Sequence, residues 1–234
     1  MRPLAVIIGV GSGLSSSLAR LLSKEGYDLV LAARQTSKFA NLTEAIGARA
    51  VSLDGSDPAA VANVFDDLPR SPDVVVYNPS ARVRGPLTDL APDAVRKAVE
   101  VTAFGAFLTG QAAARKMLAA EPKNGVRGTI LFTGASAGVK GFAQSAPFAM
   151  GKFAQRGLAE SMARELHPQG IHVAWVNIDG GIRNPDRPDR VDPENNPDSM
   201  LDPDAIAKAY LGLIRQDRSA WSNELTLRPW VERF

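Results

Sequence analysis

The chain has 234 residues, of which 45% are hydrophobic and 22% are charged, and its formal net charge is +2. This balance is that of a globular domain, and it excludes a disordered chain, a collagen and a coiled coil. No apolar run reaches the roughly 18 residues that span a bilayer, and the scattered basic residues predict no nucleic-acid surface.

The first half of the chain alternates short apolar runs with longer helical patterns. The run 4–8 is apolar throughout, as a strand covered on both faces should be. After it, leucines recur at helical spacing as far as Gly26, where a helix would stop. Ser56-Asp57-Pro58 predicts the start of another helix. The further strands predicted in this half are 28–33, 50–53 and 73–77.

The second half repeats the pattern. Its predicted strands are 129–132, 172–178 and 225–227, and its predicted helices are 92–101 running on into 104–120, 148–166 and 203–215. Strands that alternate with helices predict a doubly wound parallel sheet with helices on both faces. We therefore expect one α/β domain over residues 1–234. Only the stretch 184–202 has a biased amino-acid composition. Its Pro, Asp and Asn residues predict an irregular loop that is either functional or disordered.

A glycine-rich turn follows the first predicted strand and opens the next helix. It reads Gly9-Val10-Gly11-Ser12-Gly13-Leu14. Glycines let the backbone turn tightly and approach a pyrophosphate, while the amides at a helix N-terminus point toward the anion. The strand and the helix on either side favour a dinucleotide site over a plain tight turn.

The end of the second predicted strand indicates which dinucleotide binds. NAD enzymes place an Asp or Glu there, about 20 residues past the glycines, to accept hydrogen bonds from the ribose. This chain has Arg34 instead, and a guanidinium can pair with a 2′-phosphate. We expect NADP(H) rather than NAD(H), although a merely solvated Arg34 would leave the preference open.

Taken together, these features resemble the short-chain dehydrogenase/reductase family over nearly the whole chain. Gly9 and Gly13 match the first two glycines of its Gly-x-x-x-Gly-x-Gly turn, and Ser15 replaces the third. Ile8 stands where a threonine is usual. The resemblance implies a single Rossmann-type domain, a nicotinamide cofactor and oxidoreductase chemistry on a small carbonyl or alcohol.

Further positions match residues with which the family binds its cofactor. Asp54 matches an Asp that contacts adenine, and Asn78 matches the Asn of the Asn-Asn-Ala-Gly motif, whose Ala and Gly are replaced here. Gly180 matches the glycine of a Pro-Gly motif, with Asp179 in place of the proline. The resemblance therefore adds four cofactor-binding candidates to the turn and Arg34, namely Asp54, Asn78, Gly180 and Ile182.

The family's chemistry rests on a serine and a Tyr-x-x-x-Lys pair, and this chain keeps part of it. Ser136 falls at the serine and Lys152 at the lysine, but Phe148 stands in place of the tyrosine. Thr102 falls where the family has an Asn that holds a water near the lysine. The resemblance implies that Lys152 also binds the cofactor ribose and that Ser136 donates to the substrate oxygen. In carbonyl reduction an acid must protonate the developing alkoxide, and a phenylalanine has no proton to give.

Another group must therefore supply the proton if the chain is a reductase. Lys152 itself, or a water held by Lys152 and Ser136, is the better candidate. Tyr77 ends a strand near the cofactor, but we interpret it as a packed strand residue. With no cysteine and two histidines in the chain, we expect no metal site. The residues that we interpret as lying away from the site are Tyr27, Tyr210, His167 and His172.

Three functions remain open on this sequence. The first is an NADP(H)-dependent oxidoreductase with an altered proton-donor site. The second is a catalytically silent NADP(H)-binding protein, and the third is a non-redox enzyme on the same fold. The stretch 184–202, which falls where the family carries its substrate lid, has mixed charge and indicates no preference for an anionic substrate. Phe142 and Phe148 predict an apolar pocket.

The resemblance also implies self-association. The helices 104–120 and 148–166 resemble the pair through which family members dimerise. Trp230 and Phe234 are large apolar groups near the chain end, where a second interface is common in the family. We expect a homodimer or homotetramer with a small-molecule substrate, no nucleic-acid partner and no membrane partner. The absence of a recognisable leader predicts a cytoplasmic location.

Overall fold

A seven-stranded parallel sheet lies at the centre of the computed structural model, which describes residues 1–184 and 186–232. Its order is β3-β2-β1-β4-β5-β6-β9, and every neighbouring pair is parallel. The predicted fold class, a single Rossmann-type sheet, is confirmed. The strands are β1 (Leu4–Ile8), β2 (Asp28–Ala33), β3 (Arg49–Ser52), β4 (Val74–Tyr77), β5 (Gly128–Thr133), β6 (Ile171–Ile178) and β9 (Glu224–Leu227).

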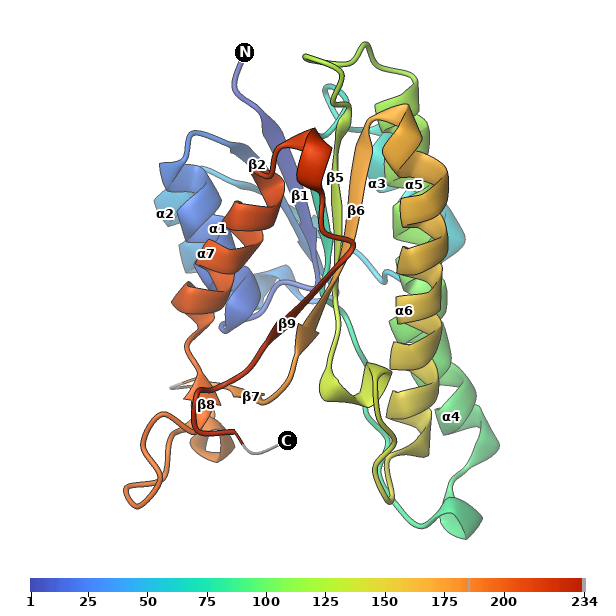
Figure 1. The fold of residues 1–234 in the computed structure, drawn as a ribbon, viewed down its shortest axis with the longest axis vertical. Helices are drawn as coiled ribbons and strands as arrows, with labels where there is room; N and C mark the ends of the chain where they lie inside the picture. Colours follow the sequence, from blue (N-terminus) through green and yellow to red (C-terminus); the bar gives the residue numbers. More distant parts are fainter. Residues whose placement is uncertain (185, 233–234) are drawn as a thin grey trace.

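Helices cover both faces of the sheet (Figure 1). One face carries α1 (Leu14–Lys24), α2 (Ala40–Ile46) and α7 (Pro203–Ile214). The other carries α3 (Pro58–Asp66), α4 (Pro92–Val99), α5 (Gly105–Leu118) and α6 (Ala146–Leu166). Among the described residues, no helix is both long enough and apolar enough to cross a membrane.

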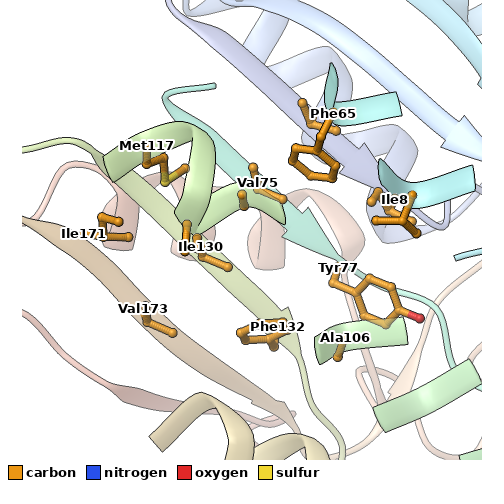
Figure 2. Packing of buried hydrophobic residues seen from close by; sticks show 14 of the residues in the cluster. Ile8, Phe65, Val75, Tyr77, Ala106, Met117, Ile130, Phe132, Ile171 and Val173 are labelled. Carbon is orange, nitrogen blue, oxygen red and sulfur yellow. The ribbon is translucent and has the colours of Figure 1, made fainter. Parts of the chain in front are cut away.

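Each face of the sheet has its own hydrophobic core, because successive side chains of a strand point to opposite faces. In β1, Val6 and Ile8 pack into one core, whereas Ala5 and Ile7 pack into the other. Figure 2 shows the first of these cores, in which Phe65 of α3 and Met117 of α5 pack over the sheet. Burial on both faces explains why the strands of this chain are apolar without alternation.

Two local features differ from the sequence-based expectation. The short helix α2 was not predicted, because it has only seven residues and no long apolar period. A π-helical turn over Glu100–Phe104 joins α4 to α5. Within this turn the carbonyl of Val101 accepts a hydrogen bond from the hydroxyl of Tyr77. An outside group that bonds to a helix carbonyl is a known cause of such an irregular turn.

The site is positioned by the reversal of strand order at the middle of the sheet. From β1 the chain continues outward to β2 and β3, and then returns to place β4 on the other side of β1. In open α/β sheets, ligands bind in the crevice outside the carboxyl ends of the strands at such a reversal. Two short strands, β7 (Gly181–Ile182) and β8 (Met200–Leu201), pair beyond β6 and bring together the ends of the 184–202 stretch.

Candidate active site

A cavity of about 470 Å³ opens at the carboxyl ends of β1, β4, β5 and β6. Most of the residues predicted for the cofactor and two of those predicted for catalysis line it. Its lining comprises Gly9, Gly11, Gly13, Leu14, Ser15, Asn78, Ser80, Arg82, Thr133, Gly134, Ala135, Phe148, Lys152, Ile178, Gly180, Ile182, Asn184, Arg187 and Arg190.

Asn78 and Ser15 hold the glycine turn in shape. The side-chain amide of Asn78 donates to the Ser15 hydroxyl (2.7 Å) and to the Gly9 carbonyl (3.3 Å). The Ser15 hydroxyl in turn donates to the same carbonyl (3.1 Å). Gly9 has φ +87°, and a Cβ there would lie 2.7 Å from the ring of Pro79. Ser15 therefore has a structural use at the position where the family carries its third glycine.

The N-terminus of α1 faces this cavity without a side-chain cap. Asp57 caps α3 and Asp202 caps α7, but Gly13 precedes α1 and the first turn of α1 holds no acidic residue. No atom lies within 4 Å of the place that a Cβ on Gly11 would occupy, so the cavity reaches the backbone there. Free helix amides and an open glycine face suit the pyrophosphate of a dinucleotide.

Arg34 and Asp54 lie at the neighbouring strand ends, outside the lining of the cavity. Arg34 follows β2 and is exposed. One oxygen of the Asp54 carboxylate accepts from the backbone and hydroxyl of Ser56, which lowers the pKa of Asp54. Its other oxygen lies 3.8 Å from the ammonium of Lys97, and both this charge and that of Arg34 lower the same pKa further. Arg34 and Lys97 thus both place positive charge near the Asp54 carboxylate.

Lys152 is the buried cation of the cavity, with 2% of its surface exposed. Its ammonium donates to the Thr133 carbonyl (2.5 Å) and to the Gln155 side-chain oxygen (3.1 Å). An ammonium has three donors, so one remains for the cavity. Burial lowers the pKa of Lys152 to about 7, and the positive charge of Arg82 contributes in the same direction.

Gln155 is a residue of the site that the sequence analysis missed. Besides accepting from Lys152, its amide donates to the backbone carbonyl of Thr102 (3.1 Å). The hydroxyl of Thr102 accepts from the backbone of Ala81 (3.1 Å), so it is committed to holding the loop after β4. Thr102 is fully buried and does not line the cavity. It therefore supports Lys152 through its carbonyl rather than through its side chain.

Phe148 lines the cavity one helical turn before Lys152, and only 7% of its surface is exposed. Residues four apart share one face of a helix, so the two side chains face the same space. Ser136 is half-buried beside the lining residue Ala135 and is not itself part of the lining. Phe142 is exposed and also lies outside it, so of the two phenylalanines expected in the pocket only Phe148 is there.

None of the three tyrosines lines the cavity. Tyr77 is fully buried and donates to Val101, and burial raises its pKa. Tyr210 is fully buried against the Thr133 hydroxyl (2.9 Å), and burial raises its pKa as well. His167 and His172 lie at the opposite end of β6, where His172 stacks on Trp221. The phenol that the family uses therefore has no substitute among these residues.

Arg82 is the second missed residue of the site. Its guanidinium lies 4.4 Å from the centre of the Phe148 ring, on the loop that follows Asn78. Burial lowers the pKa of Arg82, and the positive charges of nearby arginines lower it further. Those arginines are Arg190, Arg84 and Arg187. The mouth of the cavity is therefore strongly cationic.

Ion pairs of Arg183 hold the 184–202 stretch in place. Residue 185 of this stretch lies outside the described residues. The guanidinium of Arg183 pairs with Asp192 at 2.7 Å and lies 3.9 Å from Asp202, the cap of α7. Asp192 also accepts from the backbone of Met200 (2.8 Å). At the near end of the stretch, the Asn184 amide donates to the hydroxyl of Ser12 (3.0 Å). The stretch thus closes over the glycine turn.

Comparison with known proteins defines the class to which this fold and site belong. Residues 3–185 match the family described as short chain dehydrogenase, and the chain belongs to the short-chain dehydrogenase/reductase family. L-2,3-butanediol dehydrogenase of Corynebacterium glutamicum is 28% identical over 183 residues, which cover 74% of this chain and 69% of the relative.

Two solved structures extend this likeness over the whole sheet. A short-chain dehydrogenase from Rhodopseudomonas palustris has a TM-score of 0.80 and 33% identity over 98% of this chain and 100% of its own. A metagenomic short-chain oxidoreductase in complex with NADP has a TM-score of 0.81 and 26% identity over 98% of each chain.

Proposed function

We propose that this chain is an NADP(H)-dependent oxidoreductase that interconverts a small carbonyl compound and its alcohol. The observation that carries the proposal is the single cavity that joins an uncapped, glycine-lined helix end to a buried lysine whose pKa is about 7. The charge at Arg34 supports NADP(H) over NAD(H). The solved relative in complex with NADP supports the same choice.

Several residues in and beside the cavity have a role in this proposal. The bound nicotinamide supplies the hydride. Lys152 holds a proton at its ammonium and gives it to the substrate oxygen, because an amine with a pKa about 7 is an effective acid at neutral pH. Gln155 and the Thr133 carbonyl fix the direction of that ammonium. Phe148 and Ala135 form an apolar wall that excludes water from the reacting carbon.

A silent NADP(H)-binding protein is the second candidate. It is favoured by the phenylalanine at position 148 and by the commitment of the Thr102 hydroxyl to Ala81. Two of the family's catalytic side chains are then unavailable for chemistry. A lysine that only binds the cofactor would still be retained.

Titration and turnover measurements with the same preparation distinguish these functions. We expect the protein to bind NADPH and to oxidise it in the presence of at least one member of a broad panel of aldehydes, ketones and oxo acids. Lys152→Met should abolish turnover. Binding of NADPH without turnover on any compound would favour the silent protein, and no binding of either cofactor would overturn both.

A further inference from the structure

The side chains that line the cavity carry positive charge and no carboxylate. Arg187 and Arg190 both pair with Asp189, at 3.0 and 3.4 Å. Arg82 faces the same cavity, and no carboxylate of the described residues pairs with it. Lys152 adds a further buried amine. Cations that converge on one cavity repel each other unless an anion lies between them.

Arg187 and Arg82 differ in the part of the site that each contacts. Arg187 donates its backbone N–H to the carbonyl of Asn184, whose side chain bonds to Ser12 of the glycine turn. Arg187 thus belongs to the end of the cavity that suits a pyrophosphate. Arg82 instead lies over the ring of Phe148, which lines the cavity one helical turn before Lys152. The positive charge of Arg82 also acts on Lys152 and lowers the pKa of that residue.

We propose that the cavity takes a small carbonyl compound that also carries a carboxylate, and that Arg82 binds this carboxylate. This inference rests on the proposed function and names its substrate class. The Phe148 ring holds the guanidinium by a cation–π contact, so little freedom is lost when an anion binds. A guanidinium binds a carboxylate through two parallel hydrogen bonds, which also orients the substrate.

The reaction leaves the carboxylate unchanged. The C=O π bond of the substrate breaks, its carbon gains the hydride of the cofactor and its oxygen gains the proton of Lys152. One NADPH and one proton are consumed for each hydroxy acid formed. The carboxylate at Arg82 lies between two repelling cations, so its binding also favours the protonated state of Lys152.

Binding is tested without turnover, on protein saturated with NADP⁺, which cannot reduce a ketone. Pyruvate and acetoacetate are each compared with their methyl esters by calorimetric titration, because the two acids place the carbonyl at different distances from the carboxylate. We expect at least one acid to bind about 10- to 100-fold more tightly than its ester, as a charge-assisted pair implies. Arg82→Met should remove most of this difference and leave the affinity for NADPH unchanged.

Arg84→Met is the matched control, because Arg84 lies on the same loop and is exposed, as Arg82 is, but does not line the cavity. It should keep the preference for the acid. Equal binding of acid and ester in both pairs would overturn the inference. So would an equal loss in both variants, or a loss of NADPH affinity in Arg82→Met with the acid preference intact. A protein that binds no cofactor refutes the proposed function instead, and the same titrations without NADP⁺ still test Arg82.

Discussion

Phe148, which we expect at the position of the family's tyrosine, lines the cavity, and its ring centre lies 4.4 Å from the guanidinium of Arg82. The ring cannot give a proton, so the proton must come from elsewhere in the cavity. Among the described groups that line it, Lys152 has the pKa suited to that task. In the proposed reaction an amine therefore takes the place of the phenol that the resemblance to the family implies.

Phe148→Tyr tests this dependence. It adds one hydroxyl at nearly constant ring volume, on the helix face shared with Lys152. We expect NADPH oxidation with carbonyl substrates to rise by up to about 10²–10⁴-fold. Phe153→Tyr on the exposed side of α6 is the control and should change nothing. No gain in Phe148→Tyr, nor in its combination with Thr102→Asn, with cofactor affinity intact, would favour a silent binding protein or chemistry of another kind.

The pH profile of reduction reports on Lys152. Its pKa is lowered from 10.5 to about 7, so the ammonium is present below that pH and is lost above it. We expect kcat/KM with a neutral ketone to be level at lower pH and to fall about tenfold per unit above pH 7. Arg82→Met removes a neighbouring positive charge and should move the midpoint upward. A profile that stays flat across neutral pH would exclude Lys152 as the donor.

Cofactor choice is tested at Arg34. A bidentate contact with a 2′-phosphate contributes about 1.5–3 kcal/mol, so NADPH should bind roughly ten- to a hundredfold more tightly than NADH. Arg34→Ala should remove most of this difference in a fluorescence titration. Arg49→Ala, on the edge strand and paired with Asp67, is the control and should preserve it. Equal affinities in the unmutated protein would contradict the assignment.

At the scale of elements, the ion pairs of Arg183 hold the 184–202 stretch in place. The pairs with Asp192 and Asp202 join the loop to the cap of α7. We expect Arg183→Met to speed hydrogen exchange of the backbone amides in residues 186–202, measured by mass spectrometry. Amides of β1 and β5 should exchange as before. Unchanged exchange in the loop would mean that β7 and β8 alone hold it in place.

The elements themselves could be predicted because their signals are local. The apolar strands, the Asp57 cap and the stop at Gly26 each depend on residues close in sequence. The glycine turn was found from the strand before it and the helix after it, whereas Lys152 was found from the resemblance to the family's Tyr-x-x-x-Lys pair. The π-helical turn was missed, since it depends on the hydroxyl of Tyr77, which comes from a different element.

The rest of the site depends on contacts between distant segments. Gln155 lies three residues after Lys152, so helical spacing could have indicated it. Its partner Thr102, however, is 53 residues away in sequence. Arg82 gives no periodic signal, because its position follows from the path of the loop after β4. The mixed charge of the 184–202 stretch gave no clear indication of an anionic substrate, since the sequence does not show which charges pair with each other, as Arg183 does with Asp192.

At the scale of the whole molecule, the outer surface of α5 and α6 is unusually apolar. Phe104 and Phe107 stack at 6.1 Å between ring centres, and Met150 and Phe153 are exposed on α6. Figure 1 shows both helices on one outer side of the sheet. Trp230 is also exposed near the chain end, whereas Phe234 lies outside the described residues. Exposed aromatic residues gathered on two adjacent helices are typical of an interface.

We therefore expect a homodimer or homotetramer that is formed through the outer surface of α5 and α6. Phe107→Asp should dissociate the subunits, because it would bury an unpaired charge in this interface. Light scattering at micromolar concentration measures the change. Arg164→Asp, at an exposed position farther along α6, is the control and should keep the assembled mass. A monomeric mass for the unmutated protein would contradict the expectation.

The hydrogen bonds of Lys152 bear on the step at which this residue would be protonated again. Its two protein acceptors are the Thr133 carbonyl and the Gln155 amide, and neither group takes up or releases protons in the ordinary pH range. If Lys152 is the acid of the proposed reaction, the proton that replaces the one it gives up must arrive through the cavity. The product occupies that route until it leaves. In the proposed reaction, Lys152 therefore regains its proton only after the product has left the cavity, between one turnover and the next.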